Sequence, residues 1–338
     1  MFTNKRLLKI PLIVAMLLLL IQPALSQAEI RVIDLGTLGG RDSSANGINA
    51  QGQLVGYSTT ASGLDHAFLW SAQGGMQDLG ALGGGYSSAF DINERGQVVG
   101  ASTTAAGAPH AFLWTRQGGM QDLGTLGGSW SQAVGINDRG QVVGWSTTAS
   151  GERHAFLWTA QGGMQDLGTL GGPSSTAAGI NNREEVVGSS YIASGAFRAF
   201  LWTSGTGLQD LGALGGPSSE AYAINDRGQV VGKALNASLD KRAFLWTPQG
   251  GMQDLGALGG SWGSAVSISN RGQVVGVSGL ATGEEHAFLW TAQGGMQDLG
   301  TLGGSWSTAR GINNRGQVVG ASLTASGEVR AALWSVSP

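Results

Sequence analysis

The sequence predicts an all-β protein, a seven-bladed β-propeller, from three observations: a fixed repeat, four strand-like segments in each copy, and the places where the repeats start and stop. Asp-Leu-Gly recurs every 44 residues, followed by variants of TLGG, A-x-G-I-N, RGQVVG and HAFLW in that order. Self-similarity of this kind indicates repeated units that bury a shared core. The copies open at Asp34, Asp78, Asp122, Asp166, Asp210, Asp254 and Asp298.

The third copy illustrates the four strands. Residues 133–137 are short and apolar, 141–146 are rich in β-forming residues, 154–158 read His-Ala-Phe-Leu-Trp, and 164–167 follow a glycine-rich turn. Short turns between such segments predict an antiparallel four-stranded meander. Side chains alternate along a strand, so Phe156 and Trp158 point to one face and Leu157 to the other. Each sheet is therefore expected to be covered on both faces by its neighbours.

The two ends of the repeat region favour a closed ring over an open solenoid. The repeats begin on a fourth strand, residues 31–35, and stop on a third strand, residues 331–334. The N-terminal strand is expected to complete the last blade, whereas a solenoid would have polar capping repeats. The A-x-G-I-N strand is expected to lie innermost, where small residues relieve crowding, with Asp91 as an exception that faces the channel. A single domain is predicted over residues 29–338.

The N-x-R-G turn predicts a hairpin with glycine in the left-handed region. The fourth copy has Glu184 at that place. We expect Glu184 to adopt a positive φ at a cost of about 1 kcal/mol, and its hairpin to be the loosest of the seven.

The first 28 residues are expected to be a cleaved signal peptide. Lys5, Arg6 and Lys9 precede an apolar run over residues 10–21, and small residues flank Ala28. That run is too short to cross a bilayer as a helix, which takes about 20 residues. The expected location is therefore periplasmic or secreted, without a membrane anchor.

Composition narrows the range of partners. Loss of residues 1–28 removes three of the 19 Lys and Arg and none of the 22 Asp and Glu, which leaves a net charge of −6. An acidic surface argues against nucleic acid, whose binding depends on cations that neutralise phosphates. The chain has no cysteine, so its stability is expected to come from packing. We expect a monomer without a cofactor.

The word His-Ala-Phe-Leu-Trp resembles the HAF-repeat family of extracellular proteins, over nearly the whole chain from Ile33 to Trp334. Three copies depart from it by carrying arginine at the first position, and the last also has Ala332 for Phe. The resemblance implies export and repetition, and it implies no particular activity. The word starts at His66, His110, His154 and His286, with arginine instead at Arg198, Arg242 and Arg330.

Exchange of histidine for arginine at one repeat position argues against catalysis or metal binding there, because arginine neither coordinates metals nor deprotonates. We expect this cation to pair with a nearby acid or to cap a loop, and each aspartate of Asp-Leu-Gly to hydrogen-bond a turn within its own blade. No catalytic residue and no metal ligand is therefore predicted.

The position two residues after Leu-Gly-Gly carries different types of side chain in different copies. It holds four aromatic residues and also Asp42, Ser174 and Ser218. We expect it on a link between blades, on the same face as the loop before the histidine, so that both sets ring one mouth of the propeller. In the alternative, each Trp covers its own blade. The candidate ligand-binding residues are Tyr86, Trp130, Trp262 and Trp306, with His66, His110, His154, His286, Arg198, Arg242 and Arg330.

These features favour an exported, non-catalytic repeat protein that acts as a binding or structural module, with glycans, other extracellular polymers or an extracellular protein as partner. The alternative is a carbohydrate-active enzyme, a lyase or hydrolase, with its site at the propeller mouth. A third possibility is a structural protein without a ligand. The residues that break the repeat, Asp91, Glu184, Glu185, Lys233 and Lys241, are spread over three copies and form no known motif.

Overall fold

The computed structural model describes residues 30–336. The predicted signal peptide, residues 1–28, lies outside the described residues, as do the last two residues. Within residues 30–336, no helix is long and apolar enough to span a bilayer.

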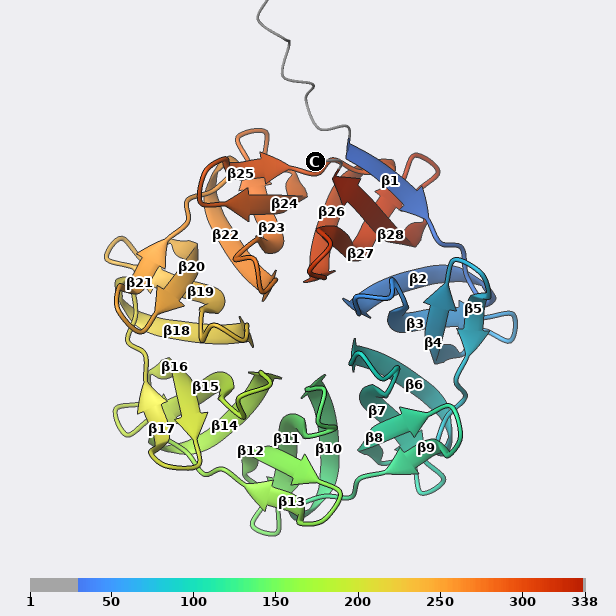
Figure 1. Ribbon diagram of the computed structural model, residues 1–338, viewed down its shortest axis with the longest axis horizontal. Coiled ribbons are helices and arrows are strands. Elements are labelled where there is room, and N and C mark those ends of the chain that lie inside the picture. The colour runs from blue at the N-terminus through green and yellow to red at the C-terminus, as the bar shows by residue number, and fades with distance from the viewer. Residues whose placement is uncertain (1–29, 337–338) are drawn as a thin grey trace, which may run out of the picture.

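The chain is all-β and forms a ring of twisted antiparallel sheets, the architecture of a β-propeller (Figure 1). Six sheets are built from consecutive strands, from β2–β5 to β22–β25, and the last contains β26, β27, β28 and β1. One parallel pairing, between Glu285 and Trp306, ties the last sheet to the one before it. The four-stranded meander predicted from the repeat is confirmed.

The strands recur with nearly constant length. The first strands are β2 (Gly39–Ile48), β6 (Gly83–Ile92), β10 (Gly127–Ile136), β14 (Gly171–Ile180), β18 (Gly215–Ile224), β22 (Gly259–Ile268) and β26 (Gly303–Ile312). The second strands are β3 (Leu54–Thr60), β7 (Val98–Thr104), β11 (Val142–Thr148), β15 (Val186–Ile192), β19 (Val230–Asn236), β23 (Val274–Leu280) and β27 (Gln317–Thr324).

The third strands are β4 (Asp65–Ser71), β8 (Pro109–Thr115), β12 (Arg153–Thr159), β16 (Phe197–Thr203), β20 (Lys241–Thr247), β24 (Glu285–Thr291) and β28 (Val329–Val336). The fourth strands are β5 (Gly75–Asp78), β9 (Gly119–Asp122), β13 (Gly163–Asp166), β17 (Gly207–Asp210), β21 (Gly251–Asp254), β25 (Gly295–Asp298) and, from the N-terminus, β1 (Ile30–Asp34).

The N-terminal strand joins the last sheet, as the chain ends predicted. β1 pairs antiparallel with β28, from Ile30 opposite Val336 to Asp34 opposite Ala332. Leu35, which follows β1, is buried in the cluster between the last and first sheets. The closing contact is therefore a backbone ladder with an apolar side chain at its end.

The core lies between the sheets. Phe156 and Trp158 of β12 pack with Val99 and Leu113 of the preceding sheet. Leu157 points the other way and packs against the following sheet. The prediction that every sheet is covered on both faces is confirmed, because the third strand places large apolar side chains alternately.

The first strand is longer than predicted. In the third copy it is the ten-residue β10 and not residues 133–137, with irregular register at two places. Gly128 allows the early start: a Cβ there would lie 2.6 Å from the carbonyl oxygen of Thr148. Trp130 therefore lies within a strand, and the expectation that this position belongs to a link between blades is wrong.

A ring of buried asparagines connects the sheets near the axis. Asn49 donates through Nδ2 to the main-chain oxygen of Asn93, 44 residues later, and Asn313 donates in turn to the oxygen of Asn49. Each Oδ1 also accepts main-chain N–H groups of its own turn, as Asn93 does from Arg95 and Gln97. The sixth copy carries Ser269 instead, so the described ring has one gap. The other donors are Asn93, Asn137, Asn181 and Asn225.

Glu184 adopts a φ of +65°, in the left-handed region where the other copies place glycine. The backbone of the hairpin is unchanged, because Glu184 N donates to Asn181 O just as Gly140 N donates to Asn137 O. The predicted strain is thus present. The sequence analysis did not anticipate a second non-glycine residue in this region, Leu239, also at +65°.

Candidate functional site

The four histidines pair with the aspartates of Asp-Leu-Gly. His66 Nδ1 lies 2.8 Å from Asp78, and the other three histidines repeat this contact at 2.7 to 2.8 Å. The same aspartates accept the N–H of the glycine two residues later, 2.8 Å away in all seven copies. Both expectations, a cation paired with an acid and an aspartate bonded to its own turn, are confirmed.

Where arginine replaces histidine, the side chain also reaches the next sheet. Arg242 pairs with Asp254 at 3.0 Å and donates to the main-chain oxygen of Ser261, 3.3 Å away. Arg198 and Arg330 donate in the same way to carbonyls of the following sheet. The contacts of this cation are therefore structural.

Two of the candidate tryptophans line clefts between neighbouring sheets. Trp306 lines a cleft of about 650 Å³ together with Glu284 of the β23–β24 loop and Glu285, the first residue of β24. Trp262 lines a cleft of about 480 Å³ with Asp240 and Lys241 of the preceding sheet. These aromatics lie on the same face as the loop before the histidine position, as predicted.

The Trp262 cleft differs from its counterparts in two ways. Gly263 replaces a serine that elsewhere bridges two sheets, as Ser131 does by accepting the N–H of Ala111 at 2.8 Å. Lys233, unique to this copy, lies at the cleft and pairs with Glu220 at 3.1 Å. The cleft therefore combines an indole with cations and carboxylates.

The remaining residues at the aromatic position are open to solvent or polar. Trp130 is 52% exposed and Tyr86 is 41% exposed. Burial against its surroundings raises the pKa of the Tyr86 hydroxyl. Trp262, by contrast, packs its ring over Gly279 of its own sheet, where a Cβ would lie 2.8 Å from the indole nitrogen. The copies thus divide between a free ring and one that partly covers its own blade.

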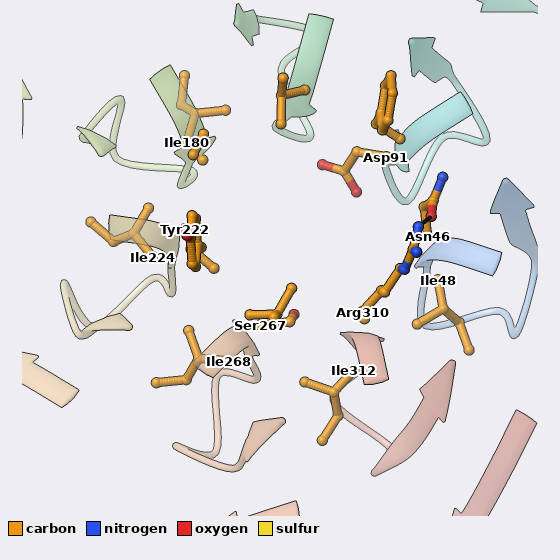
Figure 2. A pocket seen from close by; sticks show the side chains of 18 of the residues that line it. Asn46, Ile48, Asp91, Ile180, Tyr222, Ile224, Ser267, Ile268, Arg310 and Ile312 are labelled. Atoms are coloured by element: carbon orange, nitrogen blue, oxygen red, sulfur yellow. Dashed lines mark hydrogen bonds between the residues drawn. The ribbon is translucent and has the colours of Figure 1, made fainter. Parts of the chain in front are cut away.

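The first strands surround an axial cavity of about 440 Å³ (Figure 2). Of the eleven candidate residues, none is among its described lining residues. The cavity is instead lined by the residue before the small position and by that position itself, including Asn46, Asp91, Tyr222, Ser267 and Arg310. Asp91 points toward the middle of the cavity, and Arg310 reaches along its wall to Asn46 (Figure 2).

Electrostatics set Asp91 and Arg310 apart from the other repeat positions. Burial raises the pKa of Asp91 to about 7, although its two oxygens accept the N–H groups of Ile92 and Ile136. Burial also lowers the pKa of Arg310. Asp91 was predicted from the repeat to face the channel, whereas Asn46 and Arg310 were not. Both occupy the variable second residue of A-x-G-I-N, where an alignment of the copies marks them as the polar exceptions.

The isoleucines that precede the buried asparagines form a ring around the channel. Beyond this ring, at the end of the channel away from the axial cavity, the lining is polar. Residues that directly follow buried asparagines, such as Glu94 and Asp138, lie at this polar end. Such a side chain accepts the main-chain N–H of the equivalent residue in the preceding sheet, as Asp138 does from Glu94 at 2.9 Å. Asn182 also donates to both Asp138 and Asp226. This ladder adds a second set of hydrogen bonds between sheets.

The fold defines the chain as a β-propeller protein. No family model matches it and no curated protein matches it, so the HAF-repeat resemblance stays a prediction. The chain is similar to the β-propeller domain of the Trilobed protease from Pyrococcus furiosus, with 10% identity, a TM-score of 0.56 and coverage of 87% of this chain and 96% of that one.

A second similar structure is TolB from Acinetobacter baumannii, with 11% identity, a TM-score of 0.50 and coverage of 77% of this chain. The chain spans 63% of the length of that protein. The BP39L lectin from Burkholderia pseudomallei follows at 9% identity, 92% and 96% coverage and a TM-score of 0.49. Likeness at these identities shows the propeller fold, which proteins of different function share.

Proposed function

We propose that this protein is an exported, monomeric seven-bladed propeller that binds glycans in the clefts between its blades and does not cleave them. The observation that carries the proposal is the Trp306 cleft, which an indole lines together with the acidic residues Glu284 and Glu285. A sugar ring has an apolar face that packs on an indole and hydroxyl groups that donate to carboxylates. The cleft volume of about 650 Å³ lies within the usual range for small-ligand sites.

The neighbouring Trp262 cleft supports binding of a polymer. Glu285 lines both clefts, so the two sites adjoin on one face. A ligand that reaches both gains affinity, because its second contact is intramolecular. The Trp262 cleft also offers Lys233 and Lys241, which favour glycans that carry carboxylate groups.

The test is binding of the exported chain to a glycan array and to insoluble polysaccharides. We expect replacement of Trp262 and Trp306 by alanine to weaken binding at least tenfold, which corresponds to about 1.4 kcal/mol. A matched control is Ile33→Ala, because Ile33 is 48% exposed on β1 and lies outside both clefts. This control should bind like the unmodified protein.

Two results would contradict the proposal: no glycan retained by the unmodified chain, or retention that the double variant does not reduce. Shortening of the polysaccharide during the assay would instead favour the enzyme alternative. Circular dichroism of both variants checks that the propeller remains folded.

A further inference from the structure

The axial cavity holds a cation that the glycan clefts do not use. Arg310 extends from β26, and its Nη1 donates to Asn46 Oδ1 at 2.7 Å. No acid in residues 30–336 forms an ion pair with it. A guanidinium has five N–H donors, and burying a cation without a counter-ion is costly. Arg310 lines the cavity, and its one hydrogen bond within residues 30–336 is the one to Asn46, so further donors are free to bind an acceptor there.

Asn46 holds this guanidinium in place. Its Nδ2 donates to the main-chain oxygen of Ala89 at 2.7 Å, so its Oδ1 is directed to Arg310. Asn46 is itself buried, at 9% exposure. The contact joins the last, first and second sheets. Because the Arg310 side chain is already held in place, binding an anion costs little additional side-chain entropy.

The rest of the cavity wall carries both apolar and polar side chains. Phe90, Val134 and Val266 surround it at the level of Arg310, and Ile48 and Ile312 lie below them. A volume of about 440 Å³ suits a small molecule and not a polymer. The wall thus combines the guanidinium of Arg310 with apolar side chains and with the polar side chains of Asp91, Tyr222 and Ser267.

We propose that the axial cavity binds a small organic monocarboxylate, with its carboxylate on Arg310 and its apolar body against the valine and isoleucine side chains. The planar guanidinium matches a carboxylate through two parallel hydrogen bonds. Asp91 also faces the cavity, and Asp138 is the neighbouring acid that acts on it. Since the pKa of Asp91 is raised to about 7, at pH 6 it is mostly uncharged and does not repel an anion.

The test is calorimetric titration of the exported chain at pH 6 with benzoate and butyrate, alongside butyramide as the uncharged analogue and inorganic phosphate. Both carboxylates should bind and raise Tm, and butyramide should do neither. Arg310→Gln should weaken carboxylate binding at least tenfold. Arg315→Gln is the matched control, because Arg315 is an exposed arginine near the start of the same sheet's second strand.

A second variant, Arg310→Met, keeps an unbranched side chain and removes the unpaired charge, so the loss of binding can be separated from unfolding. Both Arg310 variants should retain glycan binding, because neither cleft includes this residue. The proposal is overturned by carboxylate binding that survives in Arg310→Met, by its loss in Arg315→Gln, by an equal response to phosphate, or by no response of the unmodified chain.

Discussion

Residues that recur in the copies of the repeat differ in role from residues that depart from it. Those that recur hold the sheets together: the buried asparagine donates from one sheet to the next, as Asn225 does to Ser269 O at 3.0 Å. Those that depart from the repeat, such as Arg310 and Trp262, line cavities. Symmetric positions stabilise the fold because every sheet has the same neighbours.

Ser269 is the exception that tests the asparagine ring. Its short side chain makes no bond to the next sheet and accepts its own turn's N–H groups at 3.3 Å. Ser269→Asn should add a bond to the main-chain oxygen of Asn313 and stabilise the protein by about 1 kcal/mol. Urea denaturation measures the change. The reverse exchange, Asn225→Ser, should destabilise by at least as much, and equal stability of all three proteins would show that the ring contributes nothing.

At the scale of the element, the hairpins differ more than their sequences suggest. Most turn at a glycine, whereas the β14–β15 hairpin places Glu184 at a φ of +65°. Glu184 pairs with Arg139 of the preceding sheet, and both side chains are well exposed. An exposed pair contributes up to about 1 kcal/mol and often much less, so it offsets only part of the backbone strain.

Glu184→Gly should therefore raise the free energy of unfolding, by about 0.5 to 1 kcal/mol after loss of the ion pair. Chemical denaturation checks this value. Gly272→Glu is the reverse exchange at an equivalent turn with a φ of +82°, where a Cβ meets only ordinary contacts, and it should lower stability. A less stable Glu184→Gly protein would mean that the ion pair outweighs the strain.

At the scale of the whole molecule, stability depends on how the ring is closed. β1 contributes a backbone ladder to β28, Val32 packs against the cluster between the last two sheets, and Leu35 is buried at the next interface. Asp34 also pairs with Arg330, 3.5 Å away. One short strand thus supports two interfaces between sheets.

Deletion of residues 31–36 should lower Tm sharply and cost several kcal/mol, because each buried large apolar side chain contributes about 1.5 to 3 kcal/mol and β28 is left as an unpaired edge. Circular dichroism melting curves measure the loss. Ile33→Ala, which changes an exposed side chain in the same strand, should melt close to the unmodified protein. A melting curve unaffected by the deletion would contradict closure through β1.

Much of this structure could be predicted because the same strand and turn patterns recur in all seven copies of the repeat. The alternation in Phe156-Leu157-Trp158 predicts two buried faces, and the missing last strand predicts the pairing of β1 with β28. The length of the first strand could not be predicted, since it depends on how closely Gly128 approaches Thr148. That approach is a contact between strands and leaves no periodic signal in the sequence.

The sequence by itself determined the strand order, the phase of the repeat, the left-handed Glu184 and the pairing of histidine with an acid, because each depends on neighbours at a fixed spacing. Only the tertiary structure decided which departures from the repeat come together. Trp306 lines a cleft with Glu285 of another copy, and Arg310 meets Asn46 across 264 residues. Ring closure brings Arg310 to Asn46, whereas Glu285 and Trp306 meet where consecutive sheets pack. The repeat predicts which sheets are neighbours, but it does not encode which side chains meet between them.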